Sequence, residues 1–203
     1  MPLKKFIIVK RMRMSKENAG MVKENILKKK ITKLKWMGIF TLCMVIAIFL
    51  DQWTKYLAVT HLMGKEPYSL INGVLELQFF SNTGIAWSML NGQTVFILFS
   101  GIIFLVLIFF VICKLPEASK FHVLYILGGI LTGGALGNMI DRIRLGYVVD
   151  FISFVLIHFP IFNVADMCIV CSVIVLGALF LFYYKEEDLS FLNFKQKKFR
   201  EVK

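Results

Sequence analysis

Four long hydrophobic runs divide the chain, and each has about the length that a helix needs to cross a membrane. They cover about residues 36–59, 93–113, 121–140 and 163–184. A helix rises about 1.5 Å per residue, so roughly 20 apolar residues cross the hydrocarbon core of a bilayer. The pattern therefore predicts an all-α membrane protein with four transmembrane helices.

A different pattern lies between the first two runs. Two short apolar segments, residues 68–71 and 74–80, are separated by Asn72 and Gly73, and in the second segment apolar and polar positions alternate. Asn-Gly between apolar segments favours a tight hairpin, and alternation gives a strand one apolar and one wet face. We expect a small extracytoplasmic β-sheet here, and a short extracytoplasmic loop or helix between the third and fourth runs.

Composition and charge indicate a membrane environment and predict on which side of the membrane the termini lie. The chain is 58% hydrophobic and 18% charged, with a mean hydropathy of +0.71, which is too apolar for a soluble domain of this size. Of its 24 Lys and Arg residues, twelve precede the first run, six follow the fourth, and two flank the loop between the second and third. Positive charge collects on the cytoplasmic side, so both termini are predicted to be cytoplasmic.

The same distribution predicts three parts and excludes one class of partner. We expect a basic cytoplasmic arm at residues 1–35, a four-span membrane domain at 36–184, and a basic cytoplasmic tail at 185–203. The net charge of +11 does not form a folded patch interleaved with aromatic residues, so no nucleic-acid partner is predicted.

Two of the four aspartates at the outer ends of the runs have a cation close in sequence. Asp51 lies four residues before Lys55, and Asp141 lies next to Arg142 and three residues before Arg144. Charged side chains at this spacing on a helix can pair. A structural ion pair is therefore the first interpretation of both aspartates.

The other two aspartates, Asp150 and Asp166, have no such neighbour and lie on apolar segments at the same membrane face. Burial raises a carboxyl pKa, and two carboxyls brought together share a proton. Such a pair can activate water for attack on a peptide carbonyl, as in aspartic peptidases, with no metal or other cofactor. For Asp166 alone an alternative stays open, because Asn163 could cap a helix that has Asp166 in its first turn.

The remaining polar and small residues fit a helix-packed site. Asn82 and Asn138 lie at the same depth as the aspartates, and their amides could hold a substrate backbone. Glycines recur at positions 129, 133 and 137, which lets another helix approach closely. The four cysteines lie within apolar runs, and the Cys168–Cys171 pair has no partner motif, so no metal site is predicted.

Several ordered motifs identify the chain as similar to one family. They are Asp51-Gln52-Trp53-Thr54-Lys55, Asn82 to Trp87, Gly133 to Arg142, Gly146 to Ile152, and Phe162 to Asp166. Across about residues 36–184 the chain resembles lipoprotein signal peptidase, also called signal peptidase II, of aspartic peptidase family A8. One departure is Ile85, where many members have a small residue.

The resemblance implies a membrane aspartic endopeptidase. It would remove signal peptides from diacylglyceryl-modified prolipoproteins, cutting just before the lipidated cysteine, in the bacterial cytoplasmic (inner) membrane with its site near the outer face. It further implies inhibition by globomycin-type peptides. We also expect membrane lipid as a partner and action as a monomer. Asp150 and Asp166 match the catalytic pair, and the positions that support the site or contact substrate are Asp51, Lys55, Asn82, Gly84, Asn138, Asp141, Arg142, Asn163 and Ala165.

The alternative class is a small membrane transporter coupled to protons or ions, because carboxylates within membranes also mark ion paths. Transporters often contain internal repeats and place ionisable groups at several depths. Here the carboxylates gather at one end and the two halves of the chain do not repeat. The peptidase interpretation is therefore preferred.

Overall fold

A computed structural model describes residues 2–84, 90 and 92–192, with side chains from Gly20 onward. Ile85 to Trp87 of the second motif, and residues 193–203 of the predicted tail, lie outside the described residues. The chain divides into two units, Met1–Gly38 and Ile39–Lys203. In the first unit the described residues are helical, and its lysines from Lys23 to Lys30 are exposed.

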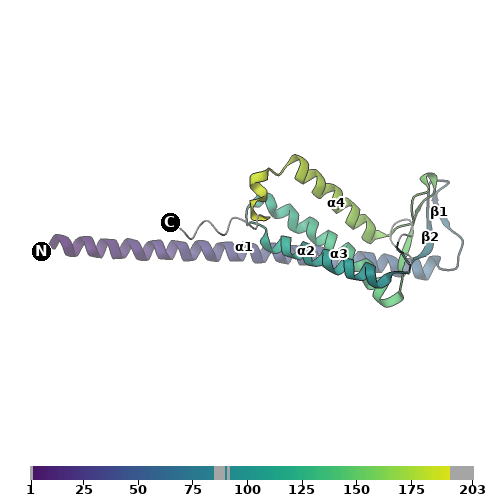
Figure 1. The fold of residues 1–203 in the computed structure, drawn as a ribbon, viewed down its shortest axis with the longest axis horizontal. Coiled ribbons are helices and arrows are strands. Elements are labelled where there is room, and N and C mark those ends of the chain that lie inside the picture. The colour runs from purple at the N-terminus through teal and green to yellow at the C-terminus, as the bar shows by residue number, and fades with distance from the viewer. Residues whose placement is uncertain (1, 85–89, 91, 193–203) are drawn as a thin grey trace. The chain divides into compact units, whose positions relative to one another are not determined.

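Four long helices make up most of the chain: α1 (Pro2–Leu62), α2 (Thr94–Lys114), α3 (His122–Leu145) and α4 (Val164–Phe182) (Figure 1). Each contains a stretch long and apolar enough to cross a membrane, which confirms the predicted four-helix membrane fold. Short 3-10 helices lie at Ser119–Phe121 (η2), Val155–Ile157 (η3) and Glu186–Leu192 (η4).

The third helix is longer than its apolar run. Asp141, Arg142 and Arg144 were expected in a loop after residue 140, but α3 continues to Leu145 and ends at Gly146, whose φ is 82°. Glycine reaches this left-handed conformation without strain, which makes it a common helix terminator. The extra turn keeps Asp141 and Arg142 on the rigid helix instead of on a loop.

A small antiparallel sheet lies at one end of the helices of the second unit (Figure 1). Its strands are β1 (Tyr68–Ile71), β2 (Leu75–Asn82) and β3 (Val148–Phe154), in that order. The hairpin predicted around Asn72-Gly73 joins β1 to β2. The third strand was not predicted, because Val148–Phe154 lacks the alternation of a half-exposed strand: five of its first six residues are buried.

A small hydrophobic core lies beside the sheet and contains residues from β2 and β3, its two longer strands. Leu77 and Phe79 of β2 pack against the buried Val149 and Phe151 of β3 and against Ala58 of α1. Leu77 and Phe79 therefore face this core, as a period of two residues requires, while all residues from Leu75 to Phe79, Glu76 and Gln78 included, are half-buried.

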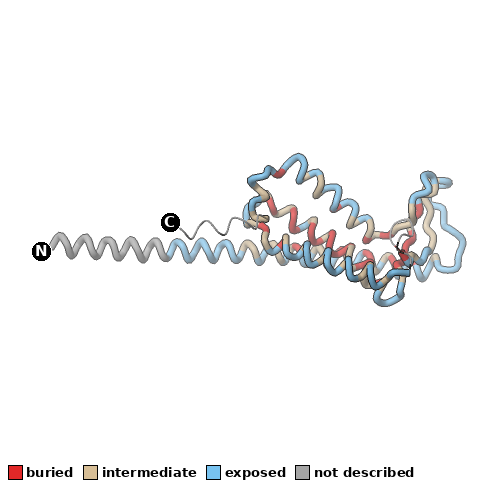
Figure 2. The backbone as a smooth tube through the Cα atoms, in the orientation of Figure 1, coloured by how far each residue is buried: buried red, intermediate tan, exposed pale blue. Residues whose placement is uncertain are grey.

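The third helix lies at the centre of the helical part and carries most of its buried residues (Figure 2). A Cβ added at Gly133 would lie 2.6 Å from the Ala47 Cβ of α1, and one at Gly134 would lie 2.6 Å from the Ala165 carbonyl oxygen of α4. The glycines thus let both neighbouring helices approach the α3 backbone, as the predicted stripe required.

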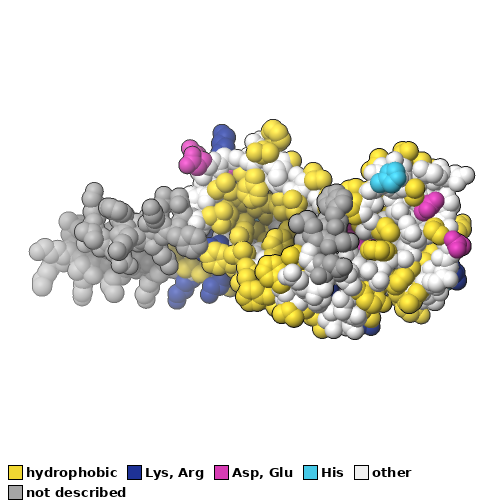
Figure 3. All heavy atoms as spheres, turned by 45° about the vertical axis from the view of Figure 1, so that its right-hand side comes forward, with side chains coloured by type: hydrophobic (Ala, Val, Ile, Leu, Met, Phe, Trp, Pro, Cys, Tyr) yellow, Lys and Arg dark blue, Asp and Glu magenta, His cyan; other side chains and the backbone are white. Residues whose placement is uncertain are grey.

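The helix surfaces away from α3 are apolar and exposed. Phe99 and Val106 of α2, and Ile174 and Leu181 of α4, are each more than half exposed. In the view of Figure 3, hydrophobic side chains cover much of the helical surface. Such a surface suits lipid better than water.

Candidate active site

Asp150 is held in the middle of β3, where its side chain is 1% exposed. Its Oδ2 accepts a hydrogen bond of 2.8 Å from the Asn82 amide on β2, and its Oδ1 accepts one of 2.6 Å from the Asn163 amide. Burial is the main cause that raises the pKa of Asp150 to about 7, the neighbouring Asp166 adds to the rise, and the two amide donors oppose it. At neutral pH this carboxyl can therefore be either protonated or ionised.

Asp166 lies in the first turn of α4, where it completes a capping box. The Asn163 side chain accepts from the Asp166 N–H at 3.0 Å, and Asp166 Oδ2 accepts from the Asn163 N–H at 3.1 Å. The alternative role predicted for Asp166, a first-turn residue of a helix capped by Asn163, is thus present. It does not occupy the whole side chain, because Oδ1 accepts a bond of 2.8 Å from the Asn138 amide. One carboxylate both starts the helix and faces the site.

Two amide side chains join the aspartates. Asn163 donates from Nδ2 to Asp150 Oδ1, to the Asn138 Oδ1 at 3.1 Å, and to the Val149 carbonyl at 3.3 Å. Asn138 in turn donates to Asp166. Asn163 is fully buried and Asn138 is nearly so. The two carboxyl groups are therefore positioned by one continuous network of hydrogen bonds.

Behind this network lies a buried ionic cluster around Lys55, which is 3% exposed. The Lys55 Nζ lies 2.9 Å from Asp51 Oδ2, 3.0 Å from Asp141 Oδ2 and 2.8 Å from Asn138 Oδ1. An ammonium group has three hydrogens, so these three acceptors use all of them. Buried charges are tolerated when they are paired and hydrogen-bonded in this way.

The partner of Asp141 differs from the one predicted. The sequence offered Arg142 and Arg144, whereas the structure pairs Asp141 with Lys55, 86 positions earlier in the chain. Adjacent residues on a helix point in different directions, so Arg142 extends elsewhere. The predicted pairing of Asp51 with Lys55 is present at 2.9 Å.

Arg142 links α3 to Gly84, two residues after the end of β2. Its Nη2 donates to the Gly84 carbonyl at 2.7 Å and its Nη1 to the Asn138 carbonyl at 3.4 Å. The Gly84 N–H donates to Asn82 Oδ1 at 3.0 Å, which turns the Asn82 amide nitrogen toward Asp150. Gly84 thus orients one of the two donors to that carboxyl.

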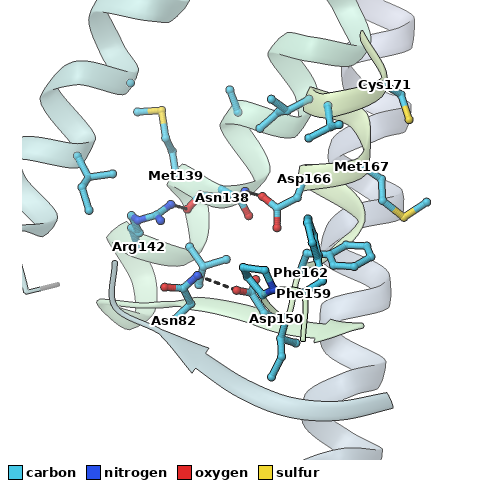
Figure 4. A pocket seen from close by; sticks show the side chains of 18 of the residues that line it. Asn82, Asn138, Met139, Arg142, Asp150, Phe159, Phe162, Asp166, Met167 and Cys171 are labelled. Atoms are coloured by element: carbon cyan, nitrogen blue, oxygen red, sulfur yellow. Dashed lines mark hydrogen bonds between the residues drawn. The ribbon is translucent and has the colours of Figure 1, made fainter. Parts of the chain in front are cut away.

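Both aspartates line a cavity of about 720 Å³. Figure 4 shows Asp150 and Asp166 together with Asn82, Asn138 and Arg142 on its polar part. Most of the remaining lining comes from apolar side chains of α2, α3, α4, β3 and the segment after β3, among them Phe104, Met139, Phe159, Phe162 and Val170. The cavity therefore joins a small polar site to a larger apolar one.

All eleven residues singled out in the sequence lie in or directly behind this region. Five line the cavity, and Asn163 links the two carboxyls. Lys55 contacts Asn138, while Asp51 accepts from the Ala165 N–H at 3.0 Å and Asp141 from the Val149 N–H at 3.1 Å. Within the residues that the structure describes, no group of three His, Cys, Asp or Glu side chains could hold a metal ion.

One further participant, Gln52, lies in the first motif, where the sequence pattern predicts no role for it. The Gln52 amide donates to Asp141 Oδ1 at 2.9 Å, and to Asp51 Oδ2 and the Gly137 carbonyl at 3.2 Å each. The only sequence signal was its position beside Asp51. Its main partners are more than 80 positions away.

The fold and the site together define a multi-pass membrane protein with a pair of carboxyl groups facing one cavity. The sequence model of the family described as Signal peptidase (SPase) II matches residues 43–182. The chain belongs to this family, and as a member it is a peptidase of the bacterial inner membrane.

Individual relatives agree with the family match. A lipoprotein signal peptidase of Caldanaerobacter subterraneus is 46% identical over 136 residues, which are 66% of this chain and 90% of the relative. One of Enterococcus faecalis is 39% identical over 146 residues, covering 72% and 86%. The fold is similar to a solved structure described as a bacterial membrane enzyme, with a TM-score of 0.64 and 32% identity over 82% of this chain and 95% of that one. These relatives give the transporter alternative no support.

Proposed function

We propose that this protein is an aspartic endopeptidase that removes signal peptides from lipoprotein precursors, with Asp150 and Asp166 as its catalytic pair. Membership of the signal peptidase II family supports the cleavage of lipoprotein signal peptides as the activity. The observation that supports the aspartic mechanism is that two carboxyl groups line one cavity and are joined through Asn163. Water held between them would be the nucleophile.

The proposed mechanism needs one proton on the pair. One carboxylate takes a proton from water as the water attacks the scissile carbonyl, and the protonated partner donates to the developing oxyanion. A raised pKa on Asp150 supports this state, because a group that titrates near pH 7 can hold the shared proton at neutral pH. Fixed amide donors around both carboxyls would limit their movement during the reaction.

The apolar part of the cavity supports a lipid-modified substrate. The helices that line it also expose apolar side chains on their outer surfaces, so acyl chains in the cavity would have apolar contacts similar to those in the bilayer. We therefore propose that the substrate is a diacylglyceryl-modified prolipoprotein, cut just before its lipidated cysteine. Globomycin-type peptides would bind in the same cavity and compete with it.

The charge distribution supports an orientation for the whole protein. Twenty Lys and Arg residues lie in segments on the side of the termini, against Lys55, Lys65, Arg142 and Arg144 on the other side. We propose that both termini are cytoplasmic and that the site lies near the outer face. Residues 1–35 and 185–203 would then be basic cytoplasmic segments flanking the peptidase domain, and the enzyme would act as a monomer.

The test compares cleavage by the wild-type protein with cleavage by Asp150→Asn and Asp166→Asn in detergent. Each substrate peptide is supplied with and without the diacylglyceryl group. We expect the wild type to cut only the lipidated form, and each variant to lose activity by about 10²- to 10⁴-fold, the range for a removed acid or base.

The matched control is Glu76→Gln. It also replaces an acid by its amide, at a residue of β2 that does not line the cavity. It should cleave at the wild-type rate. Wild-type cleavage by either aspartate variant would contradict the catalytic pair, whereas equal cleavage of unlipidated peptide would contradict only the substrate.

A further inference from the structure

The two residues that precede the proposed catalytic aspartates are anchored in the same way. The N–H of Val149, just before Asp150, donates to Asp141 Oδ2 at 3.1 Å. The N–H of Ala165, just before Asp166, donates to Asp51 Oδ1 at 3.0 Å. The backbone on which each catalytic side chain stands is thus tied to one of two buried carboxylates. The distance between those two carboxylates influences the distance between the two catalytic ones.

Lys55 holds the two anchoring carboxylates together but cannot satisfy them alone. It bonds one oxygen of Asp51 and one of Asp141, and its third hydrogen goes to Asn138. Two aspartates and one lysine leave a net charge of −1 in a site where the carboxylates are 0% and 3% exposed. Asp141 Oδ1 therefore needs another donor, and a second cation would change the charge next to the catalytic pair.

The Gln52 amide meets this need. It donates to Asp141 Oδ1 at 2.9 Å and to Asp51 Oδ2 at 3.2 Å, and it also reaches the Gly137 carbonyl of α3 at 3.2 Å. It is a neutral group that contacts both carboxylates, so it lowers their repulsion without adding charge. It also links α1 directly to α3 at the level of the site.

We propose that Gln52 is a positioning residue for the peptidase reaction, which fixes the spacing of Asp51 and Asp141 and through them the backbone that carries Asp150 and Asp166. Gln52 is not among the residues that line the cavity. Its effect is therefore on the geometry of the reacting groups and not on substrate binding. This inference rests on the proposed function of the aspartate pair.

The first test is Gln52→Met, which keeps the length of the side chain and removes its donors. We expect kcat for a lipidated peptide to fall by about 10- to 100-fold, because small displacements of reacting groups cost rates of this order, while KM changes less than about threefold. The matched control is Thr54→Val, two residues along the same helix; among the described residues its hydroxyl bonds to the backbone of its own helix, at Leu50 and Asp51. It should leave kcat unchanged.

The second test is Gln52→Glu, which remains decisive if Gln52→Met does not fold. A protonated glutamic acid restores one donor to Asp141, and an ionised one repels it. The nearby carboxylates disfavour its ionised form, so activity relative to wild type should be highest near pH 5 and should fall as the pH rises to 8. Taking the ratio to wild type at each pH removes the part of the catalytic pair's titration that both proteins share.

Two results would overturn the proposal: wild-type kcat in Gln52→Met, or a Gln52→Glu ratio that does not change with pH. A role in stability alone predicts a lower unfolding temperature with unchanged kcat per folded molecule. The outcome is separable from the proposed function. If Asp150→Asn is inactive and Gln52→Met is fully active, the catalytic pair stands and only the positioning role fails.

Discussion

Two pairs of aspartates lie side by side in this protein, and their surroundings differ in one respect. Asp51 and Asp141 share the cation Lys55. Asp150 and Asp166 receive side-chain and backbone amide donors in its place. An ammonium group stabilises the ionised carboxylate strongly, whereas neutral amides orient a carboxyl and leave it able to gain a proton. The first pair is therefore suited to anchoring the fold and the second to moving protons.

The comparison also shows why the two pairs need each other. Asp51 and Asp141 accept the N–H groups of Ala165 and Val149, the residues just before the proposed catalytic pair Asp166 and Asp150. Charged acceptors make such bonds stronger than neutral ones do. The carboxyls proposed to react can thus stay incompletely stabilised because the backbone that carries them is held by these bonds.

The largest expected effect is a loss of activity when Asp150 or Asp166, the proposed catalytic pair, is changed. Asp150→Asn and Asp166→Asn should each lower kcat by about 10²- to 10⁴-fold, and the double variant should be no worse than either single one, because groups that act as a unit are not additive. Peptide cleavage by the three purified variants measures this. If the losses in the single variants multiply in the double one, the two aspartates act independently and the shared-proton mechanism is wrong.

The next effect is a loss of stability when the cation shared by Asp51 and Asp141 is removed. Lys55→Met should lower the free energy of unfolding by about 3 to 5 kcal/mol, since it leaves two buried carboxylates without their cation. Thermal unfolding in detergent measures the loss. The comparison is Lys65→Met, a lysine at an exposed position after α1, which should unfold like the wild type. Equal unfolding temperatures for both variants would mean that the cluster does not anchor the fold.

A smaller effect tests the close approach of α1 and α3 at the anchoring pair. A Cβ at Gly137 would collide with the Asp51 carboxylate, so Gly137→Ala should cost about 1 to 3 kcal/mol of stability, as overpacking does. Gly177→Ala on α4 is the control, because nothing lies within 4 Å of its added Cβ. The prediction fails if the two alanine variants have the same unfolding temperature.

The smallest effect is the pH dependence that comes from the reactive pair. Because the pKa of Asp150 is raised to about 7 in the folded protein, its contribution to stability is fully present at low pH and is lost as the pH rises through 7. We expect roughly 1 kcal/mol less stability at pH 8 than at pH 6. Asp150→Asn should remove this slope. A slope that persists in the variant would assign the titration to another group.

Much of this organisation follows from local sequence patterns. The apolar runs of about 20 residues predict four helices, the Asn72-Gly73 pair predicts the β1–β2 hairpin, and the spacing of Asp51 and Lys55 predicts their ion pair. Each of these depends on residues close in the chain, whose relative positions are set by the period of a helix or strand. The sequence also singled out Asp150 and Asp166 by their lack of a neighbouring cation.

Other features depend on contacts between distant segments, and local patterns did not predict them. Strand β3 is buried along most of its length, so it lacks an alternating pattern. Asp141 finds its cation on α1 instead of on its own helix. Asp166 receives a hydrogen bond from Asn138 of α3, in addition to the local capping bonds. The bonds of Gln52 reach across α1 and α3.

The amino-acid sequence by itself determined which segments enter the membrane and which aspartates are reactive candidates. Only the tertiary structure decided which donor meets which carboxylate. The reason is physical: hydrophobic periodicity acts over one or two turns of a helix, whereas a buried charge must be satisfied by whatever group packing brings within about 3 Å of it.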